Sequence, residues 1–203
     1  MEYKQLYPDL FNGEDFHLWE ERNIRKEFLS YEWDMMVQEV IPDVFEFPLF
    51  NKKFCDDFVE VLKTINWDQV NRWGTPVDSN NFKLFNIDKV MTHIIHDYIF
   101  SIVQKEWNLE GKKWQMLKPD NNILKLKEGQ EIRMHHDYNH ISLYCKLDSE
   151  SEGGELVFDS NNKVINPKQG YVYMYPGQIT HRYGMKRISK GDRYFLMSYC
   201  LSD

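Results

Sequence analysis

The sequence is poor in cysteine and offers no cysteine motif. Its 203 residues include three cysteines, Cys55, Cys145 and Cys200, which are far apart and form no C-x-x-C pair. An odd number of widely spaced thiols predicts neither a disulfide framework nor a zinc ribbon. We expect each cysteine to fill space in the core.

Long apolar runs and basic stripes are also lacking. No uninterrupted apolar run approaches the ~18 residues of a membrane-spanning helix, and the first residues lack the basic-then-apolar pattern of a signal peptide. We therefore expect a soluble, cytoplasmic protein with no membrane partner. The net charge of -7, with a pI near 5.5, argues against nucleic acid as a partner. An acidic surface favours a cationic partner, although many small domains carry net charge for solubility alone.

The composition that remains is that of a folded globular domain. Hydrophobic residues make up 42% of the chain, aromatic residues 15% and charged residues 28%. These fractions are far from the low-hydrophobicity, high-charge signature of disorder. The length suits a single core, so we predict one domain over residues 1–203.

Helical periodicity dominates the first half of the chain. Between residues 14 and 40, apolar side chains recur at helical intervals, which predicts one or two amphipathic helices. Residues 1–41 are therefore expected to form a helical extension packed on the domain. A second helix is predicted after Asn51, which is placed as its N-cap, and a third from Asp88 to Gln104 or beyond.

After Lys113 the pattern changes to short β-rich runs separated by turn residues. Five runs qualify: 123–127, 140–147, 155–158, 171–175 and 193–200. Several short strands at this spacing predict a sandwich or barrel, packed here against the preceding helices. The expected class is α+β, mainly β.

The segment from Arg133 to Asp137 carries the sharpest chemical signal. Side chains alternate between the two faces of a strand, so His135 and Asp137 should converge while His136 points away. One imidazole and one carboxylate are two thirds of the two-His, one-carboxylate site of non-haem Fe(II) oxygenases. Zinc accepts the same ligand types, and H-x-D alone is as compatible with a structural role as with a metal site.

Two residues downstream extend this pattern. His181 follows the 171–175 run and a Pro-Gly turn, and Arg193 opens the last predicted strand. In a barrel, ligands that are distant in sequence can meet at one end of the interior. An inward-facing Arg193 would then hold the far carboxylate of a bound 2-oxo acid in a bidentate manner.

The chain also resembles a known family. Segments 42–62, 131–147, 151–158 and 168–199 are similar, in order and spacing, to the catalytic domain of the procollagen lysyl hydroxylases. The resemblance implies a double-stranded β-helix, or jelly roll, in a dioxygenase that uses Fe(II), 2-oxoglutarate, O2 and ascorbate. It allows a peptide or protein lysine as substrate and a homodimer as the assembly.

By this resemblance His135 and Asp137 match the first two iron ligands, and Arg193 matches the arginine that binds 2-oxoglutarate. The position of the family's third ligand, a histidine, is held here by Tyr183. His181 has the same strand parity as position 183, so we predict that His181 supplies the third ligand. The alternative is a site without a third ligand.

Three functions therefore stay open from the sequence. The favoured one is a dioxygenase whose catalytic and metal-binding residues are His135, Asp137 and His181, with Arg193 binding the co-substrate. A second is a non-catalytic jelly roll that binds peptides or dimerises. A third is a zinc-bearing cupin-like protein, which would leave Arg193 unexplained.

Overall fold

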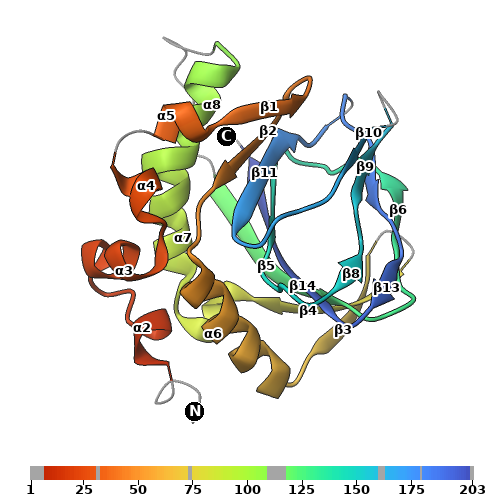
Figure 1. Cartoon of the computed structure of the whole chain (residues 1–203), viewed down its shortest axis with the longest axis horizontal. Helices are drawn as coiled ribbons and strands as arrows, with labels where there is room; N and C mark the ends of the chain where they lie inside the picture. Colours follow the sequence, from red (N-terminus) through yellow and green to blue (C-terminus); the bar gives the residue numbers. More distant parts are fainter. Residues whose placement is uncertain are drawn as a thin grey trace.

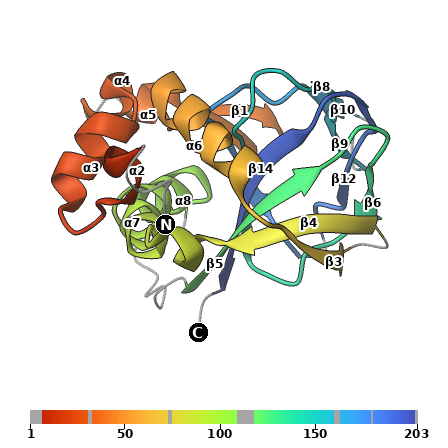
Figure 2. The same cartoon turned by 90° about the horizontal axis from the view of Figure 1, so that it is seen from below.

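A layer of helices packs against one side of a curled β-structure (Figure 1). The computed structural model describes residues 7–30, 33–72, 75–108, 118–159, 163–178 and 180–201. Seen from below, the helices gather at one side and the strands form the rest of the molecule (Figure 2). The predicted class, mainly β with supporting helices, is confirmed.

The helices agree with the sequence best where the apolar stripe is long. Asn51 caps the second predicted helix as expected, because its side chain accepts a hydrogen bond from the Phe54 amide at 2.8 Å. The third predicted helix is continuous through a π-helical segment. The helical elements are α2 (Pro8–Phe11), α3 (Phe16–Asn23), α4 (Lys26–Leu29), α5 (Trp33–Met36), α6 (Lys52–Thr64), η1 (Phe82–Phe85), α7 (Asp88–Ile94), the π-helix η2 (Ile95–Ile99) and α8 (Phe100–Glu106).

The N-terminal segment differs from the expected pair of helices. Its described residues form the short helices α2 to α5, and its end, Gln38–Ile41, is the strand β1. The reason is tertiary: β1 pairs antiparallel with β2 (Val44–Pro48) and so joins the edge of the main sheet. The prediction that the helical extension reaches residue 41 was therefore wrong for its last four residues.

The strands form one large sheet and a smaller facing sheet. The large sheet has the order β1-β2-β11-β7-β14-β5-β4-β3, the smaller one the order β10-β9-β12-β6, and β13 pairs with β8. All five predicted runs are strands. The remaining bounds are β3 (Asp68–Arg72), β4 (Thr75–Asn81), β5 (Lys118–Leu126), β6 (Ile132–His135), β7 (Ile141–Lys146), β8 (Glu152–Gly153), β9 (Leu156–Phe158), β10 (Lys163–Ile165), β11 (Tyr171–Pro176), β12 (Tyr183–Met185), β13 (Ile188–Lys190) and β14 (Arg193–Leu201).

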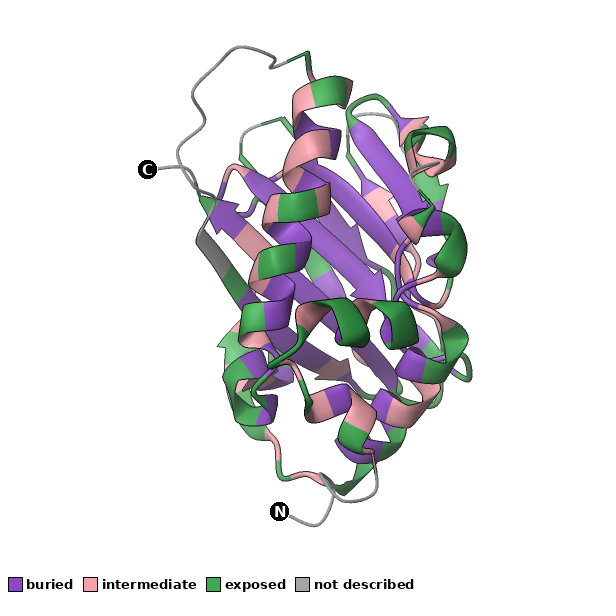
Figure 3. Ribbon diagram, turned by 90° about the vertical axis from the view of Figure 1, so that its left-hand side faces the viewer, coloured by how far each residue is buried: buried purple, intermediate pink, exposed green. Residues whose placement is uncertain are grey.

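The large sheet is buried on both faces, and this creates two cores. Along β11, Val172 and Met174 pack toward the helices, while Tyr173 and Tyr175 pack into the space between the two sheets. Figure 3 shows the helices lying over a sheet that is largely buried. We call the space between the two sheets the barrel interior; its side chains are where a jelly roll would hold a ligand.

Candidate active site

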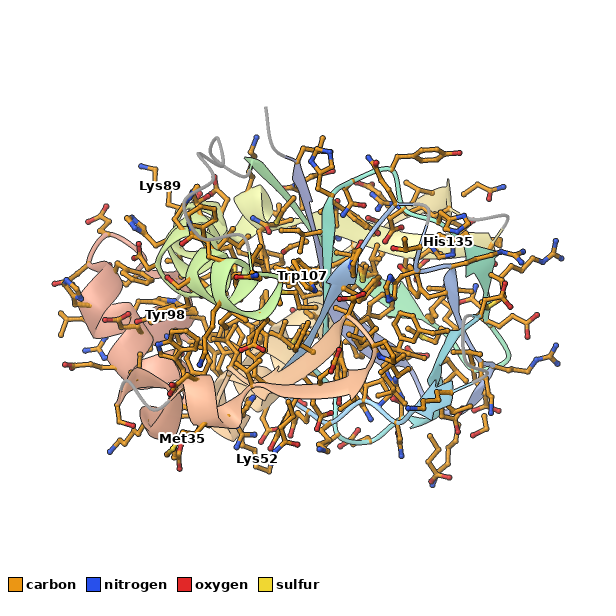
Figure 4. All side chains as sticks on the ribbon, turned by 90° about the horizontal axis from the view of Figure 1, so that it is seen from above. Met35, Lys52, Lys89, Tyr98, Trp107 and His135 are labelled. Carbon is orange, nitrogen blue, oxygen red and sulfur yellow. The ribbon has the colours of Figure 1, made fainter. Side chains whose placement is uncertain are left out.

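A β-bulge turns His135 toward the barrel interior. Strand β6 pairs with β12 so that His135 lies opposite Tyr183 and Ile132 lies opposite Met185. Ile132 and His135 are three residues apart on β6, whereas their partners on β12 are two residues apart. The extra residue in β6 lets the side chains of both Ile132 and His135 point to the inner face. The His135 ring lies 4.5 Å from the Tyr183 ring, between centroids. Figure 4 places His135 among the barrel strands, far from Tyr98 of the helical layer.

Asp137 lies next to His135, as the alternation of side chains predicted. Its Oδ1 is 3.3 Å from His135 Nε2, and the side chain is 3% exposed. Two adjacent ligands at ~2.1 Å from an octahedral ion are ~3.0 Å apart, so this separation fits a shared cation. Ser142 Oγ donates to Asp137 Oδ2 at 2.6 Å, which leaves Oδ1 directed at His135.

His181 occupies a different environment. Its Nε2 lies 2.9 Å from the Pro42 carbonyl oxygen, and its Nδ1 lies 2.9 Å from the Thr180 hydroxyl. Because a carbonyl only accepts, Nε2 donates to Pro42 and Nδ1 accepts from Thr180. Within the described residues, no three His, Cys, Asp or Glu side chains form a metal-binding group. The role of His181 as third ligand therefore stays a prediction.

Arg193 is fully buried inside the barrel and held on several sides. Its Nε donates to Ser151 at 2.6 Å, its Nη1 to the Tyr144 hydroxyl at 3.3 Å and to the Gly154 carbonyl at 3.1 Å, and its Nη2 to the Gly153 carbonyl at 2.7 Å. A Cβ at Gly154 would lie 3.1 Å from Arg193 Nη1, so the Glu-Gly-Gly turn allows this close approach. Protein acceptors thus occupy most of the guanidinium.

Lys146 is a second cation near Arg193 that the sequence reasoning did not single out. It is 8% exposed and follows Ser142 and Tyr144 on the inner face of β7. Its Nζ lies 3.9 Å from Asp148, and Arg193 Nε lies 3.3 Å from the same carboxylate. Burial, and then the charge of Arg193, lower the pKa of Lys146. Lys146 has the same strand parity as Ser142 and Tyr144. The sequence does not reveal this, because every residue of β7 is buried and polar and apolar residues do not alternate along it.

Tyrosine hydroxyls surround Asp137. Tyr175, Tyr183 and Tyr199 each have a buried hydroxyl that makes no hydrogen bond of ordinary geometry in the described part of the chain. The first two hydroxyls lie near each other, and that of Tyr199 lies near Arg72. Burial raises the pKa of all three, and the negative charge of Asp137 adds to it in each case. A buried, unpaired hydroxyl costs about 1–3 kcal/mol, so this end of the barrel fits a bound polar group.

A pocket of 390 Å³ opens directly above Asp137. Tyr138 at its rim is 95% exposed, which is unusual for a tyrosine beside a buried polar pair. His136, which the sequence analysis placed on the opposite face from His135, is exposed there. The lining residues are Arg72, Asp120, His136, Asp137, Tyr138, Asn139, Tyr199 and Leu201.

Comparison of the sequence with known proteins finds relatives of one kind. The chain matches no profile of a known protein family. It is 24% identical to human procollagen-lysine,2-oxoglutarate 5-dioxygenase 2 over 89% of its own length, and covers 26% of that protein. The chain thus spans about a quarter of the length of this relative. The predicted resemblance to procollagen lysyl hydroxylases is confirmed.

Solved structures show the same fold. An oxidoreductase of the 2OG-Fe(II) oxygenase family from Burkholderia pseudomallei superposes with a TM-score of 0.57 at 14% identity, covering 79% of this chain and 86% of that one. The viral collagen prolyl hydroxylase of Paramecium Bursaria Chlorella virus-1, solved as a 2OG complex, gives 0.55 at 14% identity, with 78% and 95% covered. The predicted jelly roll is confirmed, and the enzyme class of these proteins agrees with the predicted one.

No helix in the described ranges is long and apolar enough to cross a membrane.

Proposed function

We propose that this chain is an Fe(II)- and 2-oxoglutarate-dependent dioxygenase that hydroxylates a C–H bond of peptidyl lysine. The observation that carries the proposal is the arrangement along the inner face of β7. Ser142 holds the His135–Asp137 pair at one end, and Tyr144 contacts Arg193 toward the other. The proposed metal-binding pair and the cation proposed to bind a carboxylate therefore share one barrel interior.

His135 and Asp137 are the proposed metal ligands. His181 is the third ligand expected from the sequence, but both of its ring nitrogens are engaged, by Pro42 and Thr180. Iron bound there, together with 2-oxoglutarate and O2, would supply the oxidising chemistry, in which 2-oxoglutarate yields succinate and CO2 and one oxygen atom enters the substrate. The residues of the chain bind and orient. Ser142 fixes the Asp137 carboxylate, and the bulge in β6 aims His135.

Arg193 and Lys146 are proposed to hold the far carboxylate of 2-oxoglutarate together. The protein acceptors around Arg193 leave it little capacity for the bidentate contact expected from sequence. The Lys146 ammonium, which lies 3.9 Å from the Asp148 carboxylate, is better able to donate. The low exposure of both cations strengthens each bond to a carboxylate, because water competes little there.

The pocket above Asp137 is the proposed entry for substrate. Asp120 and the exposed Tyr138 face this opening, and a carboxylate beside an aromatic ring suits the ammonium and methylene groups of a lysine side chain. The lysine assignment also draws on the lysyl hydroxylases to which the chain is similar. A homodimer stays a prediction.

The test is succinate formation by the purified chain with Fe(II), ascorbate and 2-oxoglutarate, with and without a collagen-like Xaa-Lys-Gly peptide. We expect the lysine peptide to stimulate turnover and to gain one oxygen atom by mass spectrometry, while a matched Xaa-Arg-Gly peptide does neither. Lys146→Met and Arg193→Met should each raise the KM for 2-oxoglutarate roughly 10- to 100-fold, since each removes a charge-assisted hydrogen bond.

The contrary outcomes are distinct. Turnover that ignores both peptides would keep the chemistry and reject the substrate. Iron-loaded protein that consumes no 2-oxoglutarate would instead favour a non-catalytic peptide-binding jelly roll. That second function is supported by His181, whose two ring nitrogens are both engaged by Pro42 and Thr180.

A further inference from the structure

The His135–Asp137 pair needs a further protein donor, because iron sites of this type take three ligands from one face. The side chain directly across the strand pair from His135 is Tyr183. The two rings are 4.5 Å apart between centroids and inclined by 50°. Tyr183 thus borders the same side of the barrel interior as the pair.

The Tyr183 side chain is fixed in place by its neighbours. It is 1% exposed, stacks on Phe158 with centroids 5.9 Å apart, and meets the Tyr175 ring edge-on at 4.9 Å. Its hydroxyl is buried. Among the described residues, the oxygen lies near the Asp137 charge and the Tyr175 hydroxyl but makes no hydrogen bond of ordinary geometry, which is unfavourable unless something binds it.

We propose that the phenol oxygen of Tyr183 is the third protein ligand of the metal, completing a His, Asp and Tyr site. This inference rests on the proposed function, since it concerns the same metal. On binding, the Tyr183 O–H bond breaks, the proton leaves to solvent and an oxygen–metal bond forms, with no change in oxidation state. Tyrosine is an established iron ligand, as in catalase.

Neither the raised pKa of Tyr183 nor the presence of His181 speaks against Tyr183 as the ligand. Burial and the Asp137 charge raise the pKa of Tyr183, but a bound cation is the largest local charge and favours the deprotonated oxygen. His181 is the other donor considered, yet both of its ring nitrogens are already in hydrogen bonds, to Pro42 and Thr180. The Tyr183 hydroxyl makes no such bond to a described residue and has only a looser contact with the Tyr175 hydroxyl to give up.

Iron(III) bound to a phenolate absorbs visible light by charge transfer, and this gives a readout independent of activity. Protein loaded anaerobically with Fe(II) and then oxidised in air, without 2-oxoglutarate, should become coloured. Omitting 2-oxoglutarate prevents turnover from hydroxylating a tyrosine and adding colour of its own. Fe(II) stoichiometry and affinity are measured on the same samples before oxidation.

Four variants separate the donors. Tyr183→Phe keeps the ring but should abolish the band and weaken Fe(II) binding at least about tenfold. Tyr183→His should keep iron and lose the band. Tyr175→Phe removes another buried, unpaired hydroxyl and should keep both properties. His181→Ala should also keep the band. Thermal melts of each variant check that it is folded.

The outcomes that overturn the inference differ from those that overturn the proposed function. A band that survives in Tyr183→Phe, or one that disappears in His181→Ala but not in Tyr183→Phe, would reject Tyr183 as ligand. Stoichiometric iron without any band in the unmodified protein would reject it too, while leaving the dioxygenase intact. Protein that binds no iron at all would overturn the metal site and the Tyr183 assignment together.

Discussion

Ser142 shows how one small side chain can set the geometry of the proposed metal site. It is fully buried, donates to Asp137 Oδ2 at 2.6 Å and receives the Asn139 amide at 3.0 Å. Ser142→Ala should weaken Fe(II) binding roughly 10- to 100-fold, because the carboxylate loses the donor that orients it. Titration with Fe(II) or Co(II) measures this.

A matched control is available on β14. Ser198 is likewise fully buried, but its hydroxyl donates to Asn121 instead. Ser198→Ala should cost stability without changing metal affinity. If the two variants weaken metal binding equally, the effect comes from general destabilisation, and the role given to Ser142 is wrong.

The sequence predicted the residues proposed to bind the metal, but not the residues that hold them in position. The alternation of His135 and Asp137 predicted their convergence, and the structure places their polar atoms 3.3 Å apart. Ser142 and Lys146 went unnoticed, since β7 is buried on both faces and its sequence gives no sign of which side chains point inward. Tyr183 was noticed only as a departure from the family pattern; its pairing with His135 required the register.

At the scale of elements, capping of α6 gives a direct test of the fold. The Asn51 side chain accepts from the Phe54 amide and donates to the Arg22 carbonyl at 2.6 Å, so it joins the start of α6 to the end of α3. Asn51→Ala should cost about 1 kcal/mol and lower Tm by roughly 2–4 °C. Asn51→Asp keeps the capping acceptor and should recover most of the loss. If Asn51→Asp melts at the same temperature as Asn51→Ala, the hydrogen bond to the Arg22 carbonyl, and not the helix cap, is the interaction that stabilises the protein.

The elements that the sequence missed share a cause. Helices α6 and α7 have apolar stripes, and β7, β9, β11 and β14 are rich in apolar, β-branched and aromatic residues, so the local pattern sufficed. In β5 only residues 123–126, ILKL, give a strand signal. By contrast, β1, the β3–β4 hairpin and the three-residue β12 are defined by the neighbours that they pair with. Pairing of that kind is tertiary, and a local pattern cannot reveal it.

For the whole molecule, the reactivity of the three cysteines measures whether the helical layer separates from the sheet. Cys55 on α6, Cys145 on β7 and Cys200 on β14 all lie in the core between these layers, at 0% exposure. Burial raises the pKa of Cys55 and of Cys200 to about 12, and the pKa of Cys145 also rises. The predicted role of core filling is confirmed.

Both the low thiolate fraction and the lack of access should make these thiols inert in the folded protein. A disulfide reagent at pH 8 should label none of them in native buffer and all three in urea, and the slow native reaction should follow global unfolding. Saturating Fe(II) should slow it further, since a ligand that binds only the folded state stabilises that state. Stoichiometric labelling of one cysteine within the mixing time would show that the helical layer opens locally, and would contradict a single cooperative core on that side of the sheet.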